Sequence, residues 1–169
     1  CLVKQGNPFA DLNDDTLNLS LTATNGVLQA DTFAYAPRSL AGLIKDIAFS
    51  KPMVSKPVLQ FQLNPSLPDP VNTQIQLVFR LSWHYRQQEG QDVITYKFVP
   101  SFVPPSITSN NIDSVNIAIP VSSGWQPVEL DLWDAAAMLD HGTDNVISDI
   151  ELRMLAGLGN TVAASFCDF

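Results

Sequence analysis

Two neighbouring runs of alternating apolar and polar residues constrain the fold of this chain more than any other feature. In the first run, residues 74–86, every second side chain is apolar: Ile75, Leu77, Phe79, Leu81, Trp83 and Tyr85. The second run, residues 92–99, contributes Ile94, Tyr96 and Phe98 in the same way. A period of two is typical of a β-strand with one face on a core and the other in water. We therefore predict a β-hairpin, in which the polar residues 87–91 form a wider, glycine-containing loop.

The polar side chains of this hairpin are expected to share the opposite face. They are Gln76, Arg80, His84 and Arg86 from the first run, and Thr95 and Lys97 from the second. Arginine offers a planar fork that matches carboxylate or sulfate groups. This polar row is therefore our candidate binding surface for a polysaccharide, in particular an acidic one. The alternative is an ordinary solvated sheet face that offsets acidic neighbours, and the residue pattern leaves both open.

The rest of the chain contains further short segments with the same alternation. They span residues 17–21, 58–63, 115–121, 128–132, 150–154 and 162–166, and residues 27–35 can form the strand that returns from the first of them. Turn signals rich in Gly and Pro separate them, and no linker divides the chain. At 169 residues the chain is long enough to bury a core as one domain, residues 1–169. The pattern predicts an all-β fold, an antiparallel β-sandwich of the jelly-roll type, with one or two short helices.

Two segments carry a helical signal. Leu40, Leu43, Ile44 and Ile47 have the spacing of one helix face, with Ser39 as a possible N-cap, although a strand is the alternative here. Residues 134–139 are suited to one or two helical turns.

Three segments resemble the C-terminal half of a carbohydrate-binding module with a jelly-roll fold. They read GWQPVELDL at residues 124–132, VISDIELR at 146–153 and AASFCDF at 163–169. In that family a Trp opens a strand, a short variable segment follows, and the last strand ends near an aspartate. Residues 7–11 and 38–40 extend the resemblance into the first half. This chain has Cys167 where such modules often have a second aspartate.

The resemblance implies a non-catalytic module that attaches a secreted carbohydrate-active enzyme to a polysaccharide. Such a module raises the local concentration of substrate for a tethered catalytic domain. Related modules also bind a calcium ion between the N-terminal segment and the final strand. The resemblance therefore implies a structural calcium, with Asp11 and Asp168 as candidate ligands, although calcium needs about six to eight oxygen atoms.

Aromatic rings are the second kind of group that binds sugars. Trp125 and Trp133 share strand parity with Glu129 and Asp131, so both indoles are expected off the core face. We count Trp133 among the candidate ligand-binding residues and interpret Trp125 as a cap on one end of the sandwich. The parity of Trp83 and Tyr96 points inward, to the core.

Two enzymatic alternatives use the same residue types. Glu129 and Asp131 place two carboxylates on one strand face, as in jelly-roll glycosidases, and Glu151 could supply another carboxylate. A polysaccharide lyase could instead use Arg80, His84 and a nearby tyrosine as charge neutraliser, base and proton donor. A third class is an adhesion or structural sandwich without a sugar site.

The charge and the cysteine content limit which partners and which cellular location we expect. A net charge of -8 argues against a nucleic-acid partner, which favours a basic surface. No apolar run approaches the roughly 20 residues that span a bilayer. We predict a disulfide between Cys1 and Cys167, and with it a secreted or extracellular location. A lipidated N-terminal cysteine on a cell-surface lipoprotein, or two unrelated thiols, are the alternatives.

Overall fold

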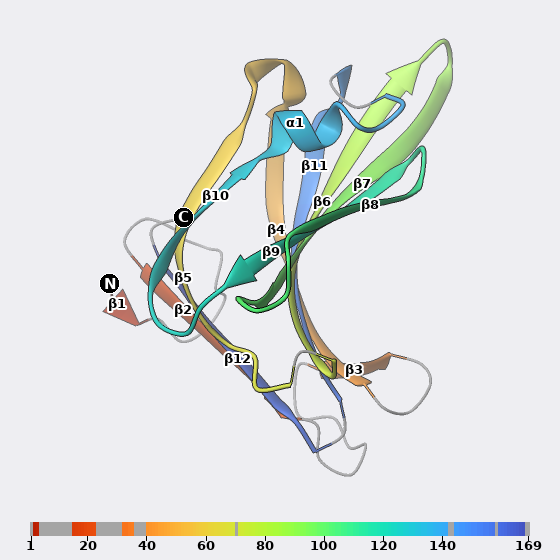
Figure 1. The fold of residues 1–169 in the computed structure, drawn as a ribbon. Helices are drawn as coiled ribbons and strands as arrows, with labels where there is room; N and C mark the ends of the chain where they lie inside the picture. The colour runs from red at the N-terminus through yellow and green to blue at the C-terminus, as the bar shows by residue number, and fades with distance from the viewer. Residues whose placement is uncertain are drawn as a thin grey trace.

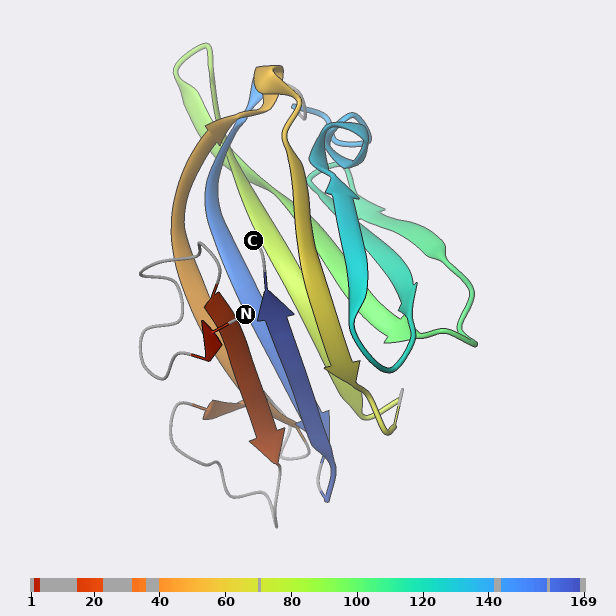
Figure 2. The same ribbon diagram turned by 90° about the vertical axis from the view of Figure 1, so that its left-hand side faces the viewer.

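The computed structural model describes residues 2–3, 15–22, 32–35, 40–69, 71–141, 144–157 and 159–167. Side chains are described within residues 51–166, except for 109 and 110. Two β-sheets pack face to face in this part of the chain (Figures 1 and 2). The prediction of an all-β sandwich is therefore confirmed.

The smaller sheet has five strands in the order β1-β2-β12-β5-β10. Their bounds are β1 (Leu2–Val3), β2 (Asp15–Thr22), β12 (Thr161–Cys167), β5 (Val58–Ser66) and β10 (Gln126–Asp131). The larger sheet has seven strands in the order β3-β4-β11-β6-β7-β9-β8. Their bounds are β3 (Thr32–Tyr35), β4 (Leu40–Pro52), β11 (Val146–Gly157), β6 (Thr73–Tyr85), β7 (Gln88–Pro100), β9 (Ser114–Val121) and β8 (Ser106–Asn111).

The strand order is that of a jelly roll. Four antiparallel pairs lie one inside the next along the chain: β6 with β7, β5 with β10, β4 with β11, and β2 with β12. Successive pairs alternate between the two sheets, as when one long hairpin is rolled up. Two pairings depart from the antiparallel pattern, because β1 runs parallel to β2 and β9 runs parallel to β7. The predicted β6–β7 hairpin is therefore the innermost pair of the roll.

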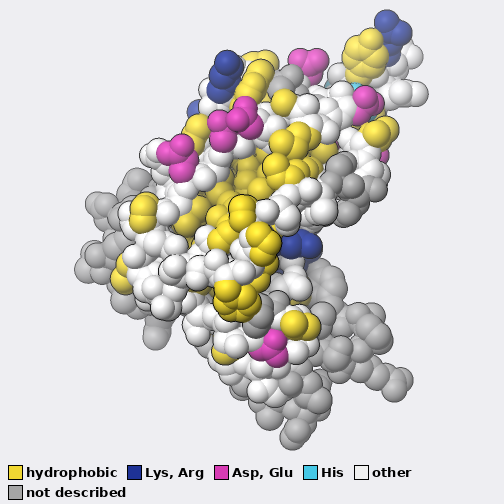
Figure 3. Space-filling model, viewed as in Figure 1, with side chains coloured by type: hydrophobic (Ala, Val, Ile, Leu, Met, Phe, Trp, Pro, Cys, Tyr) yellow, Lys and Arg dark blue, Asp and Glu magenta, His cyan; other side chains and the backbone are white. Residues whose placement is uncertain are grey.

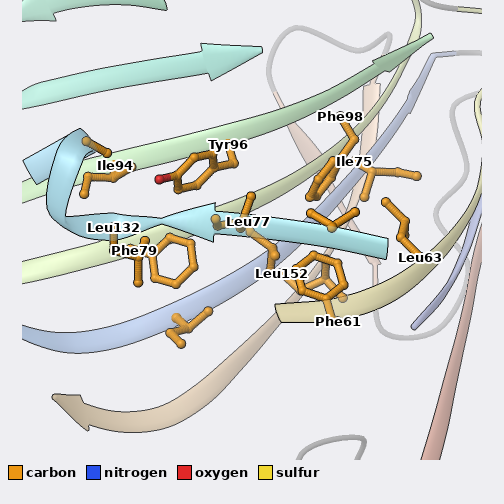
Figure 4. Packing of buried hydrophobic residues seen from close by; sticks show 14 of the residues in the cluster. Phe61, Leu63, Ile75, Leu77, Phe79, Ile94, Tyr96, Phe98, Leu132 and Leu152 are labelled. Atoms are coloured by element: carbon orange, nitrogen blue, oxygen red, sulfur yellow. The ribbon is translucent and has the colours of Figure 1, made fainter. Parts of the chain in front are cut away.

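Side chains from both sheets form one buried core (Figure 4). The Phe61 ring packs edge-on against Phe98, with 6.1 Å between the ring centroids, and lies 5.8 Å from the Phe166 ring. The contact between Phe61 and Phe98 joins the smaller sheet to the larger one, whereas Phe166 belongs to the smaller sheet, as Phe61 does. Tyr96 is buried as its parity predicts, and its hydroxyl donates a hydrogen bond of 2.8 Å to the backbone carbonyl of Asp131. Burial raises the pKa of Tyr96 well above its usual range, so this hydroxyl stays a donor.

The loop of the β6–β7 hairpin is shorter than its sequence predicts. Tyr85 pairs with Gln88, so only Arg86 and Gln87 form the turn, and residues 88–91 belong to β7. Both turn residues have positive φ, 48° and 67°, as in the two-residue turns that match strand twist. The prediction of a wider loop over residues 87–91 is wrong. The glycine in this segment does not mark a loop, because it is a residue of strand β7.

That glycine, Gly90, lies directly opposite Trp83 on the neighbouring strand. A Cβ atom at Gly90 would lie 2.2 Å from the indole ring. The absence of a side chain therefore lets the Trp83 ring lie flat across the hairpin, an arrangement known to stabilise glycine in sheets.

The two helical predictions have opposite outcomes. Residues 40–47 lie in strand β4, paired along their length with β11, so the helical interpretation is wrong and the alternative strand is correct. Backbone pairing with β11 outweighs the weak local helical spacing. The second prediction, a short helix, is confirmed by α1 (Leu132–Ala136), which begins two residues and ends three residues before the predicted bounds; the Asp131 carboxylate accepts hydrogen bonds from its first turn. A single 3-10 turn, η1 (Met53–Ser55), is also described. Within the described residues, no helix has the length and hydropathy to cross a membrane.

Candidate functional site

The outer face of the larger sheet carries four of the six side chains of the predicted polar row. Ile75, Leu77 and Phe79 point into the core, so the alternate side chains of β6 point away from it. Across the hairpin, Gln76 pairs with Lys97, and Arg80 pairs with Val93. The two strands therefore bring four of the predicted residues to one face: Gln76, Arg80, Thr95 and Lys97.

This outer face is concave. The long strands of the larger sheet bend toward the smaller sheet at mid-length, which leaves their outer side hollowed (Figure 1). The space-filling view shows the hollow as an indentation at the right of the molecule, with a basic side chain at its edge (Figure 3). Ligand sites are usually concave, with a few polar side chains that fix the orientation of the ligand.

A buried carboxylate lies at the middle of this face. Glu151, on β11, is only 2% exposed. One carboxylate oxygen, Oε1, accepts hydrogen bonds from Arg153 Nε and Nη2 at 3.0 and 2.8 Å, and the other, Oε2, accepts from Arg80 Nη2. Arg80 also donates from Nε to Asp149 at 3.2 Å. The four side chains form one ion-pair network across two strands, because Arg80 pairs with Asp149 between β6 and β11.

The polar row is less exposed than we predict from its residue types. Gln76 is 5% exposed and Thr95 is 9% exposed, so the expectation that both lie in water is wrong. Both lie on central strands with a neighbouring strand on each side, and Gln76 lies between the long side chains of Arg153 and Lys97. Gln76 Nε2 donates a hydrogen bond of 2.6 Å to Gln74. Arg80 and Lys97 remain half-buried, within reach of a ligand.

Three of the predicted residues lie away from this network. His84 is four residues beyond Arg80, about 13 Å along the strand, where its Nδ1 lies 3.2 Å from Glu89. Arg86 is in the exposed hairpin turn, with its guanidinium 5.0 Å from the centre of the Tyr85 ring. Trp133 is on α1, beyond the smaller sheet's β10, with the Lys56 ammonium 5.2 Å from its ring centre. The sequence could not place these three, because each lies at the end of an element.

The carboxylates of the glycosidase alternative do not form one site. Val128 and Leu130 point into the core from β10, so Glu129 and Asp131 point out of the smaller sheet. Glu151 points out of the larger sheet, on the opposite side of the sandwich. Glu129 accepts a hydrogen bond of 2.7 Å from Gln60, and Asp131 caps α1.

A second cluster, which the sequence did not reveal, lies at one end of the sandwich. Asp92, Asp113 and His141 each present one possible metal-binding atom, and these atoms lie within 4.8 Å of one another. Asp92 is fully buried, and this burial raises the pKa of its carboxyl group, although hydrogen bonds from Asn145 and Trp83 oppose the rise. The signal was present in the hairpin alternation, because Asp92 occupies an inward position two residues before Ile94.

Several predictions concern residues outside the described ranges. Asp11, Asp168 and Cys1 lie outside them, as does the side chain of Cys167. The calcium site and the disulfide therefore stay predictions. The backbone does place β1 and β12 in one sheet, on either side of β2.

Comparison with known protein families and with curated proteins gives no match to this chain. The interpretation of the outer face and of the second cluster therefore rests on their own geometry and chemistry.

Proposed function

We propose that this domain is a non-catalytic carbohydrate-binding module that holds a polysaccharide along the concave outer face of its larger sheet. The observation that carries the proposal is the network of Arg80, Glu151 and Arg153 at the centre of that face, flanked by the polar side chains of Gln76 and Lys97. In this role the module would attach a tethered, secreted enzyme to its substrate and raise the local substrate concentration.

The network suits sugar hydroxyls because it fixes the planar polar groups in place. Ion pairs to Glu151 and Asp149 hold the Arg80 guanidinium in one orientation before any ligand arrives. Preorganised side chains lose less conformational entropy on binding, which favours affinity. Asn116, on β9, extends the polar surface because it pairs with Thr95 on the same face.

Binding at this face would depend on hydrogen bonds rather than on ring stacking. The aromatic side chains in the described middle of β6 and β7, which are Phe79, Tyr96 and Phe98, all point into the core. A ligand with many hydroxyl or carboxylate groups fits such a surface better than an apolar one.

The charges of the described side chains on this face favour a neutral or weakly acidic polysaccharide. Arg80 and Arg153 are balanced by Asp149 and Glu151, which leaves Lys97 without an ion-pair partner among the described side chains. One uncompensated cation can bind a uronate or sulfate group, whereas a strongly sulfated chain would need more.

The contacts of Glu151 favour binding over catalysis. Both of its carboxylate oxygens already accept hydrogen bonds from arginines. A glycosidase carboxyl group needs an oxygen that faces the substrate, either to attack the sugar or to donate a proton. Glu151 is therefore suited to positioning the two arginines.

Affinity electrophoresis through gels that contain neutral, uronate-rich or sulfated polysaccharides tests the proposal. We expect retardation by at least one neutral or uronate-rich polysaccharide, without new reducing ends or unsaturated products. Lys97→Ala and Asn116→Ala should each weaken retardation at least threefold. Both side chains are partly exposed on the face, so the melting temperature should change little.

Lys51→Ala is the matched control for Lys97→Ala, because Lys51 is exposed at the end of β4 and the two substitutions change charge equally. Its retardation should equal that of the unmodified protein. If no polysaccharide retards the protein, or if Lys97→Ala and Asn116→Ala bind as well as Lys51→Ala, this face does not bind sugars.

A further inference from the structure

The second cluster joins three segments that are distant in sequence. Asp92 lies near the start of β7, Asp113 lies in the turn between β8 and β9, and His141 lies in the segment after α1. Backbone hydrogen bonds hold these segments together, from Val93 to Asp113 at 2.9 Å and from Asp140 to Ile112 at 3.0 Å. Figure 1 shows the segment after α1 at the same end of the sandwich as the β6–β7 hairpin.

Neighbouring side chains fix the orientation of the possible ligands. The Asp92 carboxylate accepts hydrogen bonds of 3.1 Å from Trp83 Nε1 and from Asn145 Nδ2. The Trp83 ring also stacks on the His141 ring, with 3.9 Å between centroids and 18° between planes. His141 Nδ1 thereby faces Asp92 Oδ1 at 3.9 Å, and its Nε2 lies 3.8 Å from Asp140. A histidine that binds a metal through one nitrogen commonly has a carboxylate near the other.

Two buried polar atoms at this cluster have no hydrogen-bond partner among the described residues: His141 Nδ1 and Asn145 Oδ1. Asn145 is only 2% exposed, and its Nδ2 donates a hydrogen bond to Asp92, which places the amide group beside the cluster. Unpartnered buried polar atoms are rare because each one loses its hydration without compensation. A bound cation with its water would satisfy both.

The donor set identifies the class of cation. An imidazole nitrogen with two carboxylates suits first-row transition metals, above all Zn²⁺, whereas Ca²⁺ requires about six to eight oxygens. Ligand atoms that share a zinc ion lie about 2.0–2.2 Å from it, so the present separations need to close by about 1 Å. Asp113 is exposed and can make this adjustment.

We propose that Asp92, Asp113 and His141 bind one divalent transition-metal ion, with Zn²⁺ as the best match, and that the metal ties β7, the β8–β9 turn and the segment after α1 together. This site lies apart from the Glu151 network and is independent of sugar binding.

Titration of chelator-treated protein with Zn²⁺ by calorimetry, together with thermal melts, tests the site. We expect one Zn²⁺ per chain with a dissociation constant in the micromolar range or below. Free Zn²⁺ at about 100 times the dissociation constant should raise the melting temperature by about 5–10 °C. Ca²⁺ at the same concentration should raise it by less than 1 °C.

Variants locate the ion. Asp113→Asn and His141→Gln should each weaken Zn²⁺ binding at least tenfold. The matched controls His84→Gln and Asp144→Asn, which remove exposed groups outside the cluster, should bind as the unmodified protein does. If His141→Gln does not fold, Asp113→Asn decides the question, because its side chain is exposed. The absence of Zn²⁺ binding, equal binding by Asp113→Asn, or stabilisation by Ca²⁺ alone would each overturn the proposal.

Discussion

Glu151 is the residue on which the outer face depends most. Its carboxylate is 2% exposed, while its two arginine partners, Arg80 and Arg153, are 32% and 23% exposed. Removing one member of a buried ion pair leaves its partners with uncompensated charge. This lowers the free energy of unfolding by about 3–5 kcal/mol when all members are buried. Because solvent reaches both arginines, the loss here should be smaller.

We expect Glu151→Gln to lower the free energy of unfolding by about 1–3 kcal/mol, measured by urea denaturation at neutral pH. Asp149→Asn is the comparison, because Asp149 is 29% exposed and its carboxylate contacts Arg80 at 3.2 Å. Asp149→Asn should lower the free energy of unfolding by less than about 1 kcal/mol. Equal losses in the two variants would show that Glu151 does not organise the face.

Gly90 shows how a single residue can mislead a prediction from sequence. A glycine in a polar segment between two strands normally indicates a loop. Here it is a strand residue that accommodates the Trp83 ring, which in turn orients His141 and donates a hydrogen bond to Asp92. The contact partner of the glycine explains its position, and that partner lies on the neighbouring strand.

Among the elements, the β6–β7 hairpin has a turn whose residues do not suit its geometry. Arg86 and Gln87 both have positive φ, which glycine and asparagine adopt far more readily than long side chains. Gln87→Gly should therefore stabilise the domain by about 0.5–1 kcal/mol. Thermal or urea denaturation measures the change.

Gln88→Gly is the matched control for Gln87→Gly, because Gln88 lies in β7 beyond the turn. This substitution should destabilise the domain, since glycine in a strand loses backbone entropy without relieving strain. A decrease in stability for Gln87→Gly as well would argue against a two-residue turn in solution.

At the scale of the whole molecule, the rolled hairpin requires contacts between distant parts of the chain. Leu17 on β2 pairs with Phe166 on β12, and Leu43 on β4 pairs with Met154 on β11. Folding must close these long loops before the pairs contribute stability, and sandwiches of this kind fold in milliseconds to seconds. Stopped-flow refolding followed by tryptophan fluorescence should show a main phase slower than about 1 ms. A single faster phase would contradict the nested strand order.

The site was predictable only in part from the sequence. Strand alternation correctly assigned Gln76, Arg80, Thr95 and Lys97 to one face, because parity is a local property of the backbone. It could not show that Glu151 and Arg153 lie beside them. These two residues are on β11, which begins more than 45 residues after the end of the hairpin, and only packing decides that β11 pairs with β6. The cluster of Asp92, Asp113 and His141 was missed for the same reason.

By itself, the sequence determined the class of fold and the direction in which most described strand side chains point. Both follow from the period of the hydrophobic pattern, which each strand carries locally. The tertiary structure alone decided that residues 40–47 form a strand, that Gly90 lies under Trp83, and which charges meet on the concave face. These outcomes depend on contacts between segments distant in sequence, and their energies exceed the local preferences of the residues involved.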